Sequence, residues 1–194
     1  MLSLESFKLG VLGLGLLLAG CDRQGEAPAQ PQAGGTQTAE RAGGKGVEAG
    51  TMDRSKAGTA IPDKIVTHPD GRTLALPSLK GKPLLINLWA TWCAPCVAEL
   101  PTLDRLAAEK GDALRVLTIS QDMQTEKVAD FLARKGGPRL EPWLDEKSDL
   151  AFAYGAQTLP TTIYYSADGR EVWRMVGGFD WAGAEAARLL AEAK

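Results

Sequence analysis

The chain has 194 residues and a formal net charge of −2 at pH 7, with 22 Lys and Arg against 24 Asp and Glu. It contains no basic run, so nucleic acid is not an expected partner. It has three cysteines, Cys21, Cys93 and Cys96, and one histidine, His68. A structural zinc site would need all four of these residues as ligands. We therefore expect neither a metal site nor a cofactor.

The first residues are typical of an export signal. Residues Met1 to Lys8 carry one lysine and one glutamate, and Leu9 to Ala19 contain only Gly, Val, Leu and Ala. This apolar run has the length of a signal segment and is too short to span a bilayer. It ends in Leu18-Ala19-Gly20-Cys21, which resembles the lipobox of bacterial lipoproteins. An ordinary secretory signal followed by a chance cysteine is the alternative.

The lipobox resemblance implies a signal peptide over residues 1–20 and a lipid anchor on Cys21. Asp22 resembles the signal that retains Gram-negative lipoproteins in the inner membrane. Residues 22–60 are rich in Gly, Ala, Gln, Thr and Pro and cannot bury a core, so residues 21–60 are predicted to form a lipidated cysteine and a disordered tether. Residues 61–194 fit one compact domain.

Two cysteines follow an apolar run and precede a helical pattern. The run Leu84 to Ala90 predicts a buried strand, and Trp92-Cys93-Ala94-Pro95-Cys96 comes directly after it. The helix is predicted from apolar residues at helical spacing, namely Val97, Leu100, Leu103, Leu106 and Ala107. At this spacing both sulfurs lie on the first helical turn, within the reach of a disulfide.

The helix start favours a reactive thiol. Free N–H groups and the positive end of the helix dipole stabilise a thiolate at Cys93. We therefore predict Cys93 as the nucleophile and Cys96, one turn deeper, as the resolving thiol of a redox-active disulfide. An inert buried pair or half of a zinc site are the alternatives.

The other elements are predicted from periodicity and turn residues. A hairpin over 65–76 is followed by the motif strand and helix, a strand over 114–119 and a helix over 125–135. A short strand at 143–144 and a short helix over 150–154 come next, before strands over 161–165 and 171–176 and a helix from about Trp181. The order strand, helix, strand implies a parallel pair, and the last two strands an antiparallel hairpin. His68 is expected on the surface.

Several motifs occur in the order found in the thioredoxin superfamily, and the chain resembles its membrane-anchored TlpA and ResA group. The resemblance implies an α/β thioredoxin-like fold: a central mixed β-sheet flanked by helices, with an N-terminal β-hairpin and a central insertion over about 122–155. It rests on the cysteine motif and on Asn87-Leu88-Trp89-Ala90-Thr91-Trp92, Glu99-Leu100-Pro101, Pro160-Thr161-Thr162 and Asp168-Gly169.

Glu99 matches the active-site glutamate of the ResA-like proteins. Asn87 stands where cytoplasmic thioredoxin has a buried aspartate that handles the proton of the resolving thiol, and an amide cannot do this. A partly buried Glu99 with a raised pKa would accept the proton of Cys96 instead. An acid that merely complements the helix N-terminus is the alternative.

The resemblance also implies a substrate-docking groove. Leu159-Pro160 matches the cis-proline loop that faces the cysteines, and its backbone would bind a polypeptide as a short added strand. Trp92 and Gly177 would complete the groove. Packing for Trp92 and a strand-end role for Gly177 are the alternatives.

We therefore expect a monomeric, lipid-anchored thiol:disulfide oxidoreductase on the periplasmic side of the bacterial inner membrane. By the family resemblance it reduces disulfides of exported proteins, such as apocytochrome c or metal-site assembly proteins, and is re-reduced by a DsbD- or CcdA-type membrane donor. The sequence does not exclude operation as an oxidant. The alternatives are a peroxiredoxin-type thiol peroxidase and a Sco-like copper-binding assembly module.

Overall fold

A computed structural model describes residues 50–192 of the chain. The predicted signal peptide, the lipidation of Cys21 and the retention signal at Asp22 lie outside the described residues. Within residues 50–192, no helix is long and apolar enough to cross a membrane.

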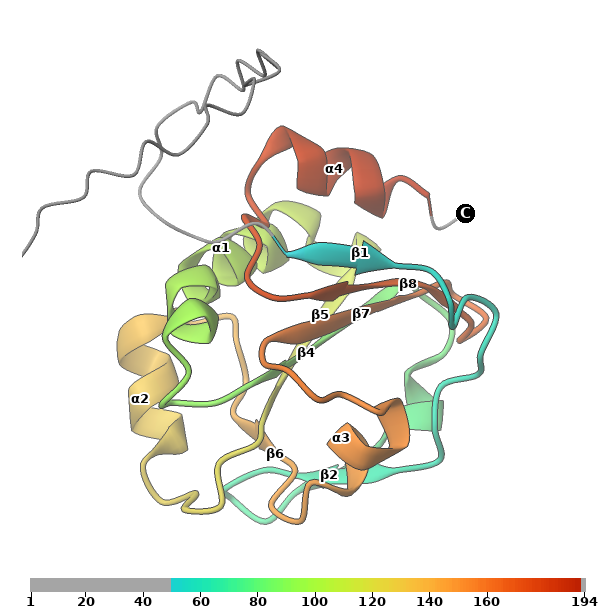
Figure 1. Ribbon diagram of the computed structural model, residues 1–194. Coiled ribbons are helices and arrows are strands. Elements are labelled where there is room, and N and C mark those ends of the chain that lie inside the picture. Colours follow the sequence, from blue (N-terminus) through green and yellow to red (C-terminus); the bar gives the residue numbers. More distant parts are fainter. Residues whose placement is uncertain (1–49, 193–194) are drawn as a thin grey trace, which may run out of the picture. The chain divides into compact units, whose positions relative to one another are not determined.

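The described residues form one mixed sheet of eight strands, in the order β1-β8-β7-β4-β5-β6-β2-β3 (Figure 1). In chain order these strands are β1 (Thr51–Asp53), β2 (Ile65–Thr67), β3 (Thr73–Ala75), β4 (Leu84–Trp89), β5 (Arg115–Ser120), β6 (Trp143–Leu144), β7 (Thr161–Tyr165) and β8 (Glu171–Val176). The strand that leads to the cysteines, β4, is central: it runs parallel to β5 and antiparallel to β7. These pairings confirm the predicted parallel pair and C-terminal hairpin.

Helices cover both faces of the sheet, and alternate residues of β4 point to different layers. Leu85 and Trp89 pack in one core with α1 (Ala94–Lys110), α2 (Val128–Lys135) and α4 (Ala184–Leu190). Leu84, Ile86 and Leu88 pack in the other with α3 (Asp149–Tyr154) and the short helix η1 (Leu76–Leu79). Because both faces are covered, β4 is buried along its whole length. In Figure 1, α1 and α4 lie on one side of the sheet and α3 on the other.

The ordered domain begins before the predicted boundary between residues 60 and 61. Strand β1 pairs with the edge of β8, with Thr51 opposite Val176. The segment after it also bonds to the sheet: the amide of Gly58 donates to the carbonyl of Glu171 over 2.7 Å. The prediction of a tether up to residue 60 is therefore wrong for residues 51–60. Backbone hydrogen bonds to a sheet edge require no apolar pattern, so composition does not reveal them.

Three further details differ from the sequence-based expectations. Helix α2 begins at Val128 instead of Thr125, and α4 at Ala184 instead of Trp181. His68 is largely buried, with 14% of its side chain exposed, because it packs edge-on against Trp143 and pairs with Asp70.

The predicted helix over 150–154 is confirmed as α3, which ends at Gly155 with φ +63°, a left-handed conformation that favours glycine.

Candidate active site

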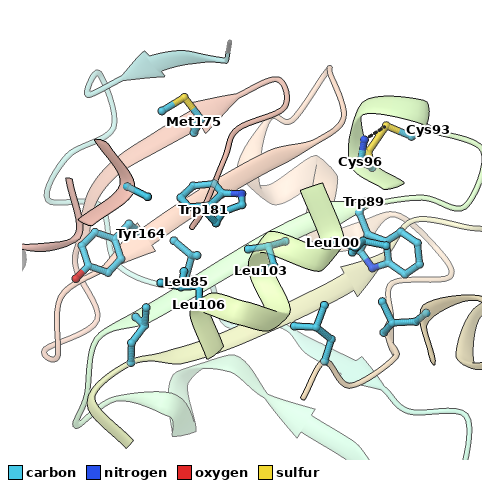
Figure 2. Packing of buried hydrophobic residues seen from close by; sticks show 14 of the residues in the cluster. Leu85, Trp89, Cys93, Cys96, Leu100, Leu103, Leu106, Tyr164, Met175 and Trp181 are labelled. Carbon is cyan, nitrogen blue, oxygen red and sulfur yellow. Dashed lines mark hydrogen bonds between the residues drawn. A yellow bond between two sulfur atoms is a disulfide. The ribbon is translucent and has the colours of Figure 1, made fainter. Parts of the chain in front are cut away.

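Cys93 and Cys96 occupy the first turn of α1, directly after the buried strand β4. They form a disulfide with an S–S distance of 2.06 Å and a Cα–Cα distance of 5.2 Å. Cys93 is the N-cap residue: its backbone is extended, and its sulfur accepts the amide of Cys96 at 3.4 Å. Pro95 lies within the first two helical positions, where a missing N–H leaves no intrahelical bond unmade. Figure 2 shows the sulfur pair at this helix start.

The two sulfurs differ in their access to solvent. Cys96 is fully buried, whereas Cys93 keeps 6% of its surface exposed. The residues around Cys93 are open: Ala94 and Pro95 are exposed, and Trp92 is 72% exposed. Cys93 is therefore the sulfur nearer to solvent, and it lies at the positive end of the α1 dipole.

Glu99 lies one turn after Cys96 on the buried side of α1 and is fully buried. Its Oε1 accepts the Nδ2 of Asn87 at 2.7 Å. Its Oε2 accepts the amide of Phe179 at 2.9 Å and the indole Nε1 of Trp181 at 3.2 Å. The carboxylate thus receives three hydrogen bonds, one from β4 and two from the segment that follows β8.

Burial raises the pKa of Glu99 from 4.5 to about 7, because a charged carboxylate loses its hydration there. The hydrogen bonds from Phe179, Asn87 and Trp181 act in the opposite direction and lower this pKa. The net value lies near neutral pH, where a group can both accept and release a proton. The predicted rise in the pKa of Glu99 is confirmed. The side chain is fully buried, whereas partial burial was expected.

The proline loop precedes β7, and the Leu159–Pro160 peptide bond is cis, as the family resemblance implied. Leu159 packs against the core cluster that contains Cys93 and Cys96. The amide of Gly177 donates to the carbonyl of Pro160 over 2.9 Å. The structure thereby joins Gly177 directly to the proline loop, while the role of these residues in substrate docking stays a prediction.

A second loop is held by residues that the sequence did not single out. The Asp122 carboxylate accepts the amide of Thr91 at 2.9 Å and its hydroxyl at 2.7 Å. The hydroxyl of Ser120 donates to the same carboxylate over 2.7 Å. Asp122 therefore fixes the turn that carries Trp92 and Cys93. Asp122 and Trp181 belong to no motif, and only their contacts reveal them.

A pocket of about 510 Å³ opens beside the cysteine motif. The pocket is lined in part by the exposed side chains of Trp92, Met123 and Lys127. Among residues 50–192, no group of three or more His, Cys, Asp or Glu side chains could hold a metal ion.

Comparisons with known proteins agree with this geometry. The Redoxin family profile matches residues 56–190. The thiol-disulfide oxidoreductase ResA of Halalkalibacterium halodurans is 30% identical over 129 residues, which cover 65% of this chain and 73% of that protein. A thioredoxin-family thiol:disulfide interchange protein of Chlorobium tepidum superposes with a TM-score of 0.58 at 24% identity, over 70% of this chain and 95% of that one. The exposed lipoprotein thioredoxin of Streptococcus pneumoniae superposes with a TM-score of 0.54 at 32% identity, over 66% of this chain and 98% of that one.

A mixed sheet flanked by helices, with a Cys-x-x-Cys disulfide at the start of α1, defines a thioredoxin-fold thiol:disulfide oxidoreductase. The chain belongs to the Redoxin family and is similar to its ResA-type thiol-disulfide oxidoreductases.

Proposed function

We propose that this protein reduces disulfides of exported proteins from a lipid anchor on Cys21. The Cys93 thiolate attacks one sulfur of a substrate disulfide and releases the other as a thiolate. Cys96 then attacks the sulfur of Cys93, which frees the second substrate sulfur and forms the Cys93–Cys96 disulfide. Two electrons pass from the protein to the substrate, which leaves as a dithiol after protonation.

The observation that carries this proposal is the placement of the disulfide across the N-terminus of α1, with the outer sulfur at the N-cap. This position stabilises a thiolate on Cys93 and leaves Cys96 within bonding distance of it. The exposed residues on either side of Cys93 leave room for a polypeptide.

Glu99 serves as the proton acceptor for Cys96. Cys96 must lose its proton to attack Cys93, and it is fully buried, so water has little access to it. The Glu99 carboxylate lies one turn further along the same side of α1, and its pKa of about 7 suits proton exchange near neutral pH.

The proline loop, Trp92 and Gly177 form the docking groove. Leu159 packs against the core cluster that contains both cysteines, and we propose that a bound polypeptide adds to the backbone of this loop as a short extended segment. Trp92 supplies an exposed aromatic surface next to Cys93.

The membrane location is supported by the N-terminal sequence and by the likeness to a lipoprotein thioredoxin at 32% identity. A dithiol in an oxidising compartment stays reduced only with a steady supply of electrons, which a DsbD- or CcdA-type membrane protein would provide. Apocytochrome c and metal-site assembly proteins are the clients that we propose. We further propose that the protein acts as a monomer in the inner membrane, where Asp22 retains it.

The test compares the purified reduced protein on a protein disulfide and on hydrogen peroxide. We expect rapid reduction of the disulfide with formation of one internal disulfide per chain, and slow reaction with peroxide. Faster turnover of peroxide would contradict the proposal. In cells, Cys21→Ser should move the protein from the inner-membrane fraction to the soluble fraction; an unchanged distribution would remove the lipid anchor from the proposal.

A further inference from the structure

We propose that Trp181 is a positioning residue, which holds the Glu99 carboxylate in place for proton transfer from Cys96. This inference rests on the proposed role of Glu99 as proton acceptor. Trp181 lies in the segment between β8 and α4 and is 82 residues from Glu99 in the sequence. It lies outside the cysteine motif in the sequence, although it belongs to the same core cluster as both cysteines.

Trp181 is bonded to α1 at two points. Its indole Nε1 donates to Oε2 of Glu99 over 3.2 Å. Its backbone amide donates to the hydroxyl of Thr102 over 3.2 Å, and that hydroxyl donates to the carbonyl of Glu99 over 2.7 Å. Both the backbone and the side chain of Trp181 are thus bonded to the same turn of α1, with the indole N–H directed at the carboxylate.

The ring of Trp181 is also held by packing. It is 1% exposed and stacks on Trp173 with a ring-centroid distance of 6.3 Å and an interplanar angle of 10°. Phe179 meets it edge-on at 4.9 Å. Figure 2 shows the indole among the core side chains that pack along α1. Rotation of the ring would disrupt these contacts, so the donor is preorganised.

The polar groups that face the Glu99 carboxylate come from β4 and from the segment between β8 and α4. Asn87 of β4 and the amide of Phe179 donate to it with Trp181, and Thr162 of β7 accepts a second hydrogen bond from Asn87. The titratable neighbour on α1 is Cys96. Asp180, between Phe179 and Trp181, is exposed, and its carboxylate accepts the amide of Ala182.

Among the described residues, all hydrogen-bond partners of the Glu99 carboxylate are donors, so they favour its ionised form. Burial raises the pKa of Glu99, and the hydrogen bond from Trp181 lowers it. Removal of this hydrogen bond therefore raises the pKa of Glu99 further. A carboxyl that stays protonated at neutral pH cannot accept the proton of Cys96. Exchange should then require a higher pH, although the cysteines and their contacts are unchanged.

The test is Trp181→Phe, which keeps an aromatic ring and removes the N–H. Trp143→Phe is the matched control, because Trp143 is also a buried tryptophan whose Nε1 donates to a carboxylate, that of Glu141, but it packs in the other core cluster. We measure the single-turnover rate of protein disulfide reduction from pH 5 to pH 9. For Trp181→Phe, the midpoint of the rising limb should move up by about one pH unit, which makes exchange about tenfold slower below the midpoint. The control should keep the wild-type midpoint.

If Trp181→Phe fails to fold, β-(3-benzothienyl)alanine at position 181 keeps the shape of the indole and replaces the N–H by sulfur; the same shift is expected. A midpoint equal to that of Trp143→Phe would overturn the proposal for Trp181. Glu99→Gln separates this outcome from a failure of the proposed function. If the pH–rate profile of Glu99→Gln keeps the rising limb of the wild type, Glu99 is not the proton acceptor. If Glu99→Gln loses this limb while the midpoint of Trp181→Phe equals that of its control, only the inference about Trp181 fails.

Discussion

The amide of Asn87 donates from Nδ2 to Oε1 of Glu99 over 2.7 Å, and both side chains are completely buried. This bond joins the central strand β4 to the active-site helix α1. The same Nδ2 donates to the hydroxyl of Thr162 on β7 over 2.9 Å. Asn87 itself transfers no proton in the proposed reaction. It orients the Glu99 carboxylate, which we propose accepts the proton of Cys96.

The first prediction concerns the proton acceptor. Glu99→Gln keeps the size of the side chain and removes the group that titrates near pH 7. Thiol-disulfide exchange should slow by about a hundredfold at neutral pH and lose its dependence on a group with that pKa. Stopped-flow measurement from pH 5 to pH 9 checks this, and circular dichroism should show an unchanged fold. A wild-type rate at every pH would assign Glu99 to helix-terminus charge compensation instead.

The second prediction concerns stability. Burial makes the folded-state pKa of Glu99, about 7, higher than its ordinary value of 4.5, so the folded protein binds this proton more tightly than the unfolded chain. Its contribution to stability is fully present below about pH 4.5 and is lost as the pH rises through 7.

The free energy of unfolding of the wild type, relative to that of Glu99→Gln, should therefore fall by about 3 kcal/mol between pH 4 and pH 8.5. Denaturant titrations of both disulfide-bonded proteins give this difference, and the subtraction removes groups common to both. A difference that is constant with pH would mean that Glu99 titrates at its ordinary value.

The third prediction concerns Trp92, whose side chain is 72% exposed. Trp92→Ala should raise the KM for a protein disulfide by about tenfold, because it removes an aromatic contact surface beside Cys93. The rate with a small disulfide and the free energy of unfolding should stay close to wild type. Phe152→Ala is the control: Phe152 is 89% exposed and lines a different pocket. Equal effects of the two substitutions would argue against a docking role for Trp92.

The fourth prediction concerns Gly177, which has φ +95° and donates to the carbonyl of Pro160. A Cβ at this position would strain the backbone and lie 3.3 Å from the Cα of Gly50. Gly177→Ala should lower the free energy of unfolding by about 1–3 kcal/mol and slow exchange by displacing the proline loop. Gly155→Ala, at φ +63° in open space, should lower stability without slowing exchange. If both variants exchange at the wild-type rate, Gly177 serves only to end the strand.

Local patterns predicted most of the fold and the reactive centre. The strand before the cysteines, their spacing and the following apolar periodicity all lie within about two dozen residues, so the sequence places them without tertiary information. Edge strand β1 was missed because it is stabilised by backbone hydrogen bonds to β8 rather than by an apolar pattern.

The residues that orient Glu99 were harder to predict. Trp181 is 82 residues away and Asn87 is 12, and no spacing rule connects either to a carboxylate on α1. Asp122 similarly reaches Thr91 across 31 residues. Such contacts depend on how β8 and the loop after β5 pack on α1, which a single sequence does not determine.

The most direct measurement traps the reaction half-way. Chains that carry Cys21→Ser, with either Cys96→Ala or Cys93→Ala, are mixed with a protein disulfide, quenched in acid and analysed by mass spectrometry without reductant. The proposed chemistry predicts a stable mixed disulfide on Cys93 in the Cys96→Ala chain and almost none in the Cys93→Ala chain. An adduct that forms equally well on Cys96, or no adduct on Cys93, would contradict it.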